Sequence, residues 1–140
     1  MRIIVVGASG TIGAAVAEAL SQRHEVVPVS RSKCAHRVDI AAKDSIERLF
    51  SSIGAFEAVV SVAGQAAFRP VDELTDDDFQ LSLRSKLMGQ VNLVRIGMNH
   101  VRDSGSFTLT GGVLAHEPMA YVAAIEGNYN GQTLDARKFV

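Results

Sequence analysis

The stretch Ile3-Ile4-Val5-Val6-Gly7-Ala8-Ser9-Gly10-Thr11-Ile12-Gly13 decides how this chain folds. Its four β-branched residues predict a short buried strand, and the alanine-rich segment 14–20 predicts a helix. Three glycines with the spacing G-x-x-G-x-x-G join the two. Gly7 suits a tight turn, Gly10 lets the main chain approach a ligand closely, and Gly13 lets the helix pack against the strand. A strand, a glycine turn and a helix in this order are typical of a nucleotide site.

The turn also offers groups that bind phosphate. The start of a helix carries free N–H groups and a partial positive charge, which attract phosphate oxygens. The hydroxyls of Ser9 and Thr11 add further donors. We therefore expect a dinucleotide to contact Gly7, Ser9, Gly10, Thr11, Ile12 and Gly13. The alternative is a glycine-rich turn that binds no ligand.

Size and composition narrow the class of protein. The 140 residues suffice for one hydrophobic core and are too few for two ordinary domains. A net charge of −1 provides no basic surface for nucleic acid. No apolar run is long enough to cross a bilayer, and Met1-Arg2 leads into a strand instead of a signal peptide. The single cysteine and the scattered histidines predict a cytoplasmic protein with no disulfide and no metal site.

Apolar runs alternate with helical patterns along the chain, which predicts an α/β fold with a parallel sheet between two layers of helices. We expect a doubly wound, three-layer Rossmann fold with the strand order 3-2-1-4-5. The expected strands are residues 3–6, 25–29, 37–40, 56–62 and 105–110. The expected helices are 11–22, 43–52 and a long one that begins near Thr75. Pro28 conflicts with an inner strand because proline has no N–H to donate.

The long helix and the tail lead to further expectations. Thr75 and Asp78 have the spacing of a capping box. Apolar residues from Leu83 to Val101 recur every three or four positions, which predicts one apolar stripe. Residues 1–118 are expected to form the nucleotide-binding domain and 119–140 an irregular tail. The fifth strand would then be an uncovered edge, which predicts a homodimer or aggregation.

The residues after the second strand indicate which coenzyme binds. Dinucleotide sites commonly hold the adenosine ribose with an acidic residue at this place, but here the sequence is Ser30-Arg31-Ser32. Arg31 would pair with a 2′-phosphate, and the two serines would add donors, so the sequence favours NADP(H) over NAD(H). Asp39 and Ile40 are expected to meet the adenine ring. The alternative for Arg31 is a solvated loop charge.

These motifs resemble those of short-chain dehydrogenases/reductases over about residues 1–120. The resemblance also includes Ser61-Val62-Ala63-Gly64 and Gly105–Gly112. It implies that Ala63 and Gly64 pass beneath the nicotinamide ribose, although only these two residues remain of the common Asn-Asn-Ala-Gly. A divergent branch with a Lys-Leu-x-Gly helix is more similar, and its later elements suggest that this chain is truncated or frame-shifted.

The resemblance implies a catalytic Asn, Ser, Tyr and Lys, and the chain departs from all four. Lys86 takes the place of the Asn, Gly111 that of the Ser, and no Tyr-x-x-x-Lys occurs. Lys86 is a candidate to hold the ribose or polarise a carbonyl, and Tyr121 to donate a proton. The alternatives are a snorkelling lysine and a loop tyrosine.

Three functions remain open at this point. The first is an NADP(H)-dependent oxidoreductase that acts on a small carbonyl or alcohol. The second is a nucleotide-binding sensor, regulator or degenerate relative without catalysis. The third is a structural fragment that must dimerise or remain partly unfolded. The substrate itself is not predicted.

Overall fold

The computed structural model describes residues 1–112, 122–123 and 133–135. Its sheet has the order β3-β2-β1-β4-β6-β8, in which the first five strands are parallel and β8 is antiparallel to β6. These strands are β1 (Arg2–Val6), β2 (Glu25–Ser30), β3 (His36–Arg37), β4 (Phe56–Ser61), β6 (Val101–Leu109) and β8 (Thr133–Asp135). A separate ribbon pairs β5 (Arg69–Pro70) with β7 (Val122–Ala123). The predicted doubly wound fold is confirmed, with β6 as the fifth parallel strand.

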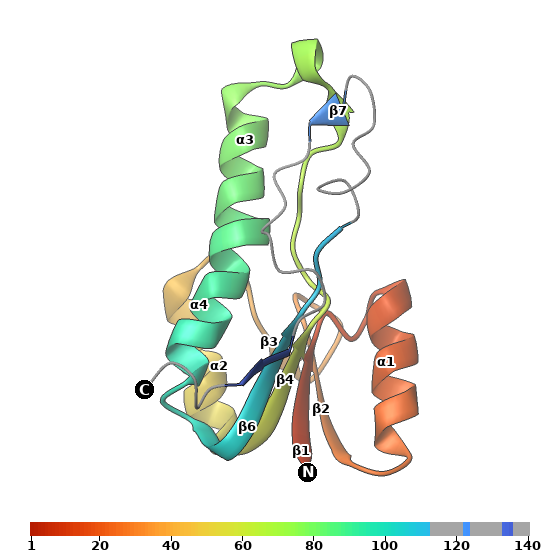
Figure 1. The fold of residues 1–140 in the computed structure, drawn as a ribbon, viewed down its shortest axis with the longest axis vertical. Coiled ribbons are helices and arrows are strands. Elements are labelled where there is room, and N and C mark those ends of the chain that lie inside the picture. The colour runs from red at the N-terminus through yellow and green to blue at the C-terminus, as the bar shows by residue number, and fades with distance from the viewer. Residues whose placement is uncertain (113–121, 124–132, 136–140) are drawn as a thin grey trace.

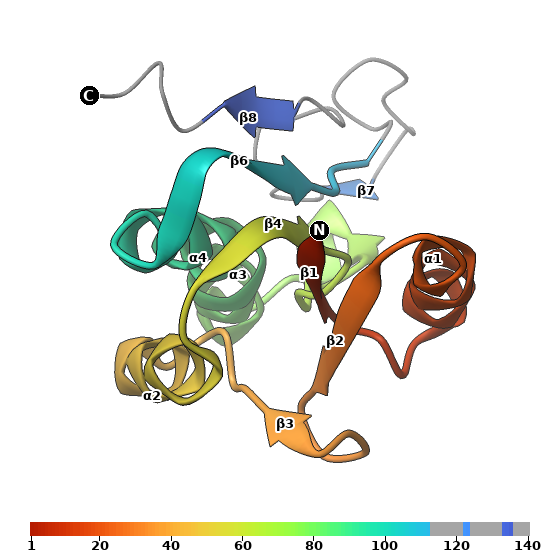
Figure 2. The ribbon, with the colours of Figure 1, turned by 90° about the horizontal axis from the view of Figure 1, so that it is seen from below.

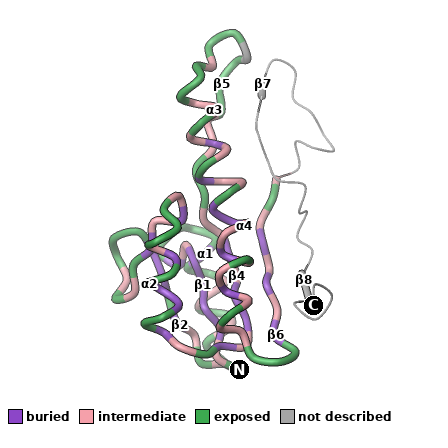
Figure 3. Tube along the Cα trace, turned by 90° about the vertical axis from the view of Figure 1, so that its left-hand side faces the viewer, coloured by how far each residue is buried: buried purple, intermediate pink, exposed green. Residues whose placement is uncertain are grey.

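The helices cover both faces of the sheet, as Figure 2 shows. They are α1 (Thr11–Ser21), α2 (Lys43–Ile53), the short η1 (Val71–Glu73), α3 (Asp76–Ser82), the π-helical turn η2 (Leu83–Leu87) and α4 (Met88–Gly97). Alternation along β1 explains the two layers. Ile3 and Val5 pack toward α1, whereas Ile4 and Val6 join the larger cluster with α2 and α4. Buried residues therefore follow the central strands (Figure 3).

Pro28 fits an inner strand because of where its nitrogen faces. Successive residues of a strand direct their polar groups to opposite sides. The carbonyl of Val29 accepts from Gly7 on the β1 side, and that of Ser30 accepts from Val38 on the β3 side. The nitrogen of Pro28 therefore faces β3, whose first residue pairs with Val29. Among the described residues no strand lies beside Pro28 on that side, so its missing N–H costs the sheet no hydrogen bond.

The third strand is shorter than the predicted 37–40, since it comprises only His36–Arg37. The segment beyond it uses its backbone groups to start α2 instead. Asp39 donates its N–H to the Ser45 hydroxyl over 3.0 Å, and its carboxylate accepts from the N–H of Ala41 over 3.0 Å. Such a local side-chain bond competes with strand pairing. Ile40 nevertheless remains buried in the core.

The long helix has the predicted capping box at Thr75 and Asp78. Its buried positions include Ser82, Ser85, Gly89, Leu93 and Gly97, while Val101 already belongs to β6. These positions recur every three or four residues, so the helix buries one stripe, which contains serines and glycines as well as Leu93. Among the predicted apolar residues, Val94 and Met98 are half-buried and pack against the core.

The two glycines of α4 permit a close approach to the core. An added Cβ at Gly89 would stand 3.0 Å from the Ile40 side chain, and one at Gly97 would stand 2.7 Å from the Phe107 ring. Larger residues would push the helix away from the sheet. This packing holds α4 against the strands whose ends form the site. No helix within the described ranges is both long and apolar enough to cross a membrane.

The last strands correct two expectations. β6 begins at Val101, ahead of the predicted 105, and a bulge with Ser104 at a φ of +67° lies between its two parts. β8 then pairs with β6 from Ser106 to Thr108, so this edge is covered and the tail is not wholly irregular. The argument for a homodimer through an open edge is lost.

Candidate functional site

A cavity of about 450 Å³ opens at the carboxyl ends of β1, β2 and β4. β1 lies between β2 and β4, so the order of the sheet reverses at this point. Ligands of doubly wound sheets bind at such a reversal. Most of the predicted contacts line this cavity, namely Gly7, Ser9, Gly10, Ser30, Arg31, Asp39, Ile40, Ala63 and Gly64. Val6, Val38, Val62, Gln65 and Ser85 complete the lining.

Two of the three glycines in the first turn are required by the fold itself. Gly7 has a φ of +95°, and an added Cβ would lie 2.9 Å from the carbonyl oxygen of Val62. An added Cβ at Gly13 would collide with the carbonyl of Gly7. Gly10 differs, because its added Cβ would meet only the Gly7 oxygen, at 3.4 Å. The described chain therefore leaves room for a side chain at Gly10, at the edge of the cavity.

The first turn of α1 is open to a ligand. Gly10 is its N-cap residue and supplies no side-chain hydrogen bond. The N–H groups at such a helix start need an acceptor from outside the helix. Thr11 and Ile12 do not line the cavity, although both are exposed in this turn and Ile12 is 68% exposed. An anionic group seated above Gly10 would satisfy these donors.

The loop after β2 brings a cation to the cavity. The buried Ser30 accepts hydrogen bonds from the N–H groups of Lys33 and Cys34, both over 2.8 Å, which turns the chain sharply. Arg31 lines the cavity, whereas Ser32 is exposed and does not. The first serine thus shapes the loop, and the predicted role of the second as a donor gains no support from its position.

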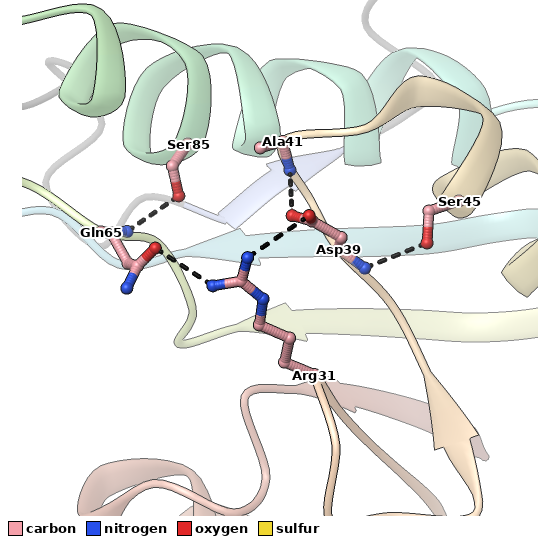
Figure 4. A network of polar contacts seen from close by, with 6 residues as sticks. All are labelled: Arg31, Asp39, Ala41, Ser45, Gln65 and Ser85. Atoms are coloured by element: carbon pink, nitrogen blue, oxygen red, sulfur yellow. Dashed lines mark hydrogen bonds and ion pairs between the residues drawn. The ribbon is translucent and has the colours of Figure 1, made fainter. Parts of the chain in front are cut away.

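Arg31 crosses the cavity to two other loops, as Figure 4 shows. Its Nη1 donates to the Oε1 of Gln65 over 3.3 Å, and its Nη2 lies 3.6 Å from a carboxylate oxygen of Asp39. The backbone N–H of Gln65 donates in turn to the Ser85 hydroxyl over 2.9 Å. The predicted residues Arg31 and Asp39 are therefore brought together with a third, unpredicted one.

Two buried serines of the long helix hold the segment after β4. Ser85 accepts from the N–H of Gln65, and Ser82 accepts from the N–H of Ala67 over 3.0 Å. Both serines are at most 5% exposed. Sequence reasoning missed them and Gln65. The available signal was a pair of serines three positions apart in a helix otherwise rich in leucine, since buried hydroxyls need partners.

Lys86 stands directly over this segment. Gly64 has a φ of +129°, and an added Cβ there would lie 3.2 Å from the Cα of Lys86 and 2.7 Å from its Cδ. The lysine stem therefore packs on Gly64, which lines the cavity. Tyr121 lies outside the described residues.

The position that the family resemblance assigns to a serine offers no reactive hydroxyl. Gly111 is exposed and has no side chain. The neighbouring Thr110 is engaged, because its hydroxyl donates to the carbonyl of Ser61 over 3.0 Å. Its own carbonyl accepts from the amide of Gln90 over 3.0 Å. Within the described part of the chain, no three His, Cys, Asp or Glu residues gather as a metal site.

Comparison with known proteins agrees with this architecture. Residues 3–103 match the model of the NAD dependent epimerase/dehydratase family. Versicolorin reductase stcU of Emericella nidulans is 29% identical in a match that covers 76% of this chain and 49% of the reductase. The structure of the protein lin1944 from Listeria innocua has a TM-score of 0.82 and 42% identity, over 84% of this chain and 59% of that one.

A small-chain dehydrogenase solved in complex with NADPH is also similar. Its TM-score is 0.78 at 28% identity, over 86% of this chain and 55% of the dehydrogenase. The chain thus spans between 49% and 59% of the length of these three relatives. It belongs to the NAD dependent epimerase/dehydratase family, and its resemblance to short-chain dehydrogenases/reductases is confirmed.

Proposed function

We propose that the cavity at the carboxyl ends of β1 and β4 binds NADP(H). Gly10 carries this proposal, because the chain itself leaves room for a Cβ there and a closely seated diphosphate would not. The uncapped start of α1 supplies donors at the same place. The neighbour solved with NADPH supports the choice of coenzyme, and Arg31 provides the cation that a 2′-phosphate needs.

The proposed contacts follow the cavity from the first turn to the end of β4. Gly7, Ser9, Gly10, Thr11, Ile12 and Gly13 would hold the diphosphate, with Thr11, Ile12 and Gly13 contributing through the helix start. Ser30, Arg31 and Ser32 would hold the 2′-phosphate end. Asp39 and Ile40 would border the adenine, and Ala63 and Gly64 would lie against the nicotinamide ribose.

We propose further that the protein is an oxidoreductase for a small carbonyl or alcohol. The bound coenzyme would supply or accept the hydride. Lys86 is the candidate to hold the ribose or polarise the substrate oxygen, since its stem packs on Gly64. Tyr121 remains the candidate proton donor on sequence grounds alone. The similarity to a versicolorin reductase supports the assignment of the reaction class.

A second candidate function is coenzyme binding without catalysis, as in a sensor or a degenerate relative. Two observations favour it specifically. The position expected for a catalytic serine is Gly111, and the sequence contains no Tyr-x-x-x-Lys. Incubation with NADPH and a panel of small aldehydes and ketones separates the two. Oxidation of NADPH supports the enzyme, and tight binding without oxidation supports the second candidate.

Titration of both coenzymes tests the binding proposal. We expect NADPH to bind more tightly than NADH, and the Arg31→Ala variant to lose at least about tenfold of NADPH affinity, or about 1.4 kcal/mol, with little change for NADH. Arg48→Ala, which removes an exposed arginine of α2 away from the cavity, is the matched control. NADH binding more tightly than NADPH to the unmodified chain would overturn the choice of coenzyme.

A further inference from the structure

The guanidinium of Arg31 already has partners on both sides. One nitrogen donates to Gln65 over 3.3 Å, and the other lies 3.6 Å from the Asp39 carboxylate (Figure 4). All three residues line the same cavity, and each comes from the end of a different strand. A phosphoryl group that pairs with both Nη1 and Nη2 competes with these acceptors for the same two nitrogens, because the guanidinium presents its N–H groups in one fixed plane.

The Asp39 carboxylate is held in place by the loop, because it accepts from the N–H of Ala41 while the Asp39 N–H donates to Ser45, each over 3.0 Å. The backbone of Gln65 is fixed by its N–H, which donates to the buried hydroxyl of Ser85 over 2.9 Å, although the Gln65 residue is exposed. The side chain of Arg31 is 67% exposed and makes its contacts from the solvent side. Arg31 is therefore free to turn from the fixed Asp39 carboxylate toward a ligand.

The charges at this end of the cavity affect the binding of the two coenzymes differently. The Asp39 carboxylate attracts Arg31 and so draws the guanidinium away from a 2′-phosphate that needs it. The 2′-hydroxyl of NAD(H) is neutral and needs no guanidinium. The same carboxylate thus weakens the binding of one coenzyme and hardly affects the other.

We propose that Asp39 and Gln65 set the coenzyme selectivity of this site by competing with the 2′-phosphoryl group for the guanidinium of Arg31. The proposal rests on NADP(H) binding at this cavity, and it gives Asp39 a role opposed to that of a simple adenine contact. Asp39 is the stronger competitor because it is charged. Gln65 is the weaker one because its amide oxygen is neutral.

Asp39→Asn tests the proposal most directly. The amide oxygen of asparagine can still accept from the N–H of Ala41, so the loop keeps its shape while the charge is removed. We expect the Kd for NADPH to fall by about fivefold and that for NADH to change by less than about twofold, since exposed ion pairs are weak. Gln65→Ala should lower the NADPH Kd by about twofold without any change in charge.

Asp44→Asn is the matched control, because it removes an exposed carboxylate of α2 that does not line the cavity. It should leave the selectivity unchanged. Titration with adenosine 2′,5′-bisphosphate and with AMP repeats the comparison for the adenosine half of each coenzyme alone. Thermal unfolding of each variant shows whether it is folded. If Asp39→Asn does not fold, Gln65→Ala alone tests the proposal.

The double variant Arg31→Ala, Asp39→Asn separates competition from direct repulsion. In the Arg31→Ala background we expect Asp39→Asn to change NADPH affinity by less than about twofold. A full-sized effect there, or unchanged selectivity in Asp39→Asn and Gln65→Ala, overturns the competition while NADP(H) binding stands. An unmodified chain that binds neither coenzyme overturns the proposed function as well, so the two failures are distinguishable.

Discussion

At the scale of single residues, Gly10 and Gly13 share one motif but serve different needs. A side chain at Gly13 collides with the Gly7 carbonyl, whereas one at Gly10 meets that carbonyl only at 3.4 Å. Gly13 is therefore a requirement of folding, whereas the described chain does not itself require glycine at position 10, which is the observation behind the proposed diphosphate site.

The alanine variants of these two glycines should behave in opposite ways. Gly13→Ala should destabilise the protein by about 1–3 kcal/mol, because the added methyl overpacks the turn. Gly10→Ala should keep the unfolding midpoint and lose at least about tenfold of NADPH affinity. Urea unfolding and a coenzyme titration measure the two effects. Unchanged NADPH binding in a folded Gly10→Ala would remove the main support for the proposed site.

Lys86→Met tests the candidate for chemistry, since methionine retains the stem that packs on Gly64 and removes the ammonium. We expect NADPH oxidation with a reactive aldehyde to fall by about a hundredfold or more, the usual effect of losing an acid or a polarising group. NADPH affinity should change by less than about threefold. Lys43→Met, on the exposed side of α2, is the control. Turnover at the original rate would assign Lys86 to packing.

At the scale of elements, the start of α3 depends on a single reciprocal pair. Thr75 donates its N–H to the Asp78 carboxylate over 3.0 Å, and its hydroxyl accepts from the N–H of Asp78 over 3.3 Å. The backbone N–H of Thr75, and after it the hydroxyl, hold the pKa of Asp78 below its usual value. The ionised form is therefore the one that stabilises the helix.

This pair predicts a pH dependence with a definite sign. A lowered folded pKa gives stability that is complete at neutral pH and is lost as the pH falls through that pKa. Thr75→Ala should cost about 1 kcal/mol at pH 7. Asp78→Asn should also destabilise at pH 7, and the difference from the unmodified chain should narrow by about pH 3. Urea midpoints at the two pH values measure this, and a constant difference would contradict it.

The elements also show what sequence reasoning reaches and what it misses. The period of β1 and the glycine spacing predicted the first turn, and the position of Arg31 just after the second strand predicted that it would lie at the cavity, which it lines. The π-helical turn was not predictable from a 3.6-residue period, because it changes the period itself. Gln65 and Ser85 were missed for a related reason. Their contact joins residues 20 positions apart, and although the serine pair of the helix indicates a buried partner, no pattern in the sequence identifies Gln65 as that partner.

At the scale of the whole molecule, the sheet order explains why one cavity collects so many of the predicted residues. Parallel strands end at the same edge, so the loops after β1, β2, β3 and β4 meet there although they are far apart in sequence. The long helix projects beyond this edge and anchors the segment after β4 (Figure 1). The site is thus a product of topology, and the residues within it decide the ligand.

β8 extends the sheet beyond β6 and forms its edge on that side. The pairing of Ser106–Thr108 with Thr133–Asp135 occupies backbone groups that otherwise form a template for another strand. A chain that ends at residue 132 should expose this edge and self-associate. A chain that ends at residue 135 retains β8 and is the matched control. Light scattering after size exclusion should give a larger molar mass for the shorter chain, and equal masses from two folded chains would show that β8 does not protect the edge.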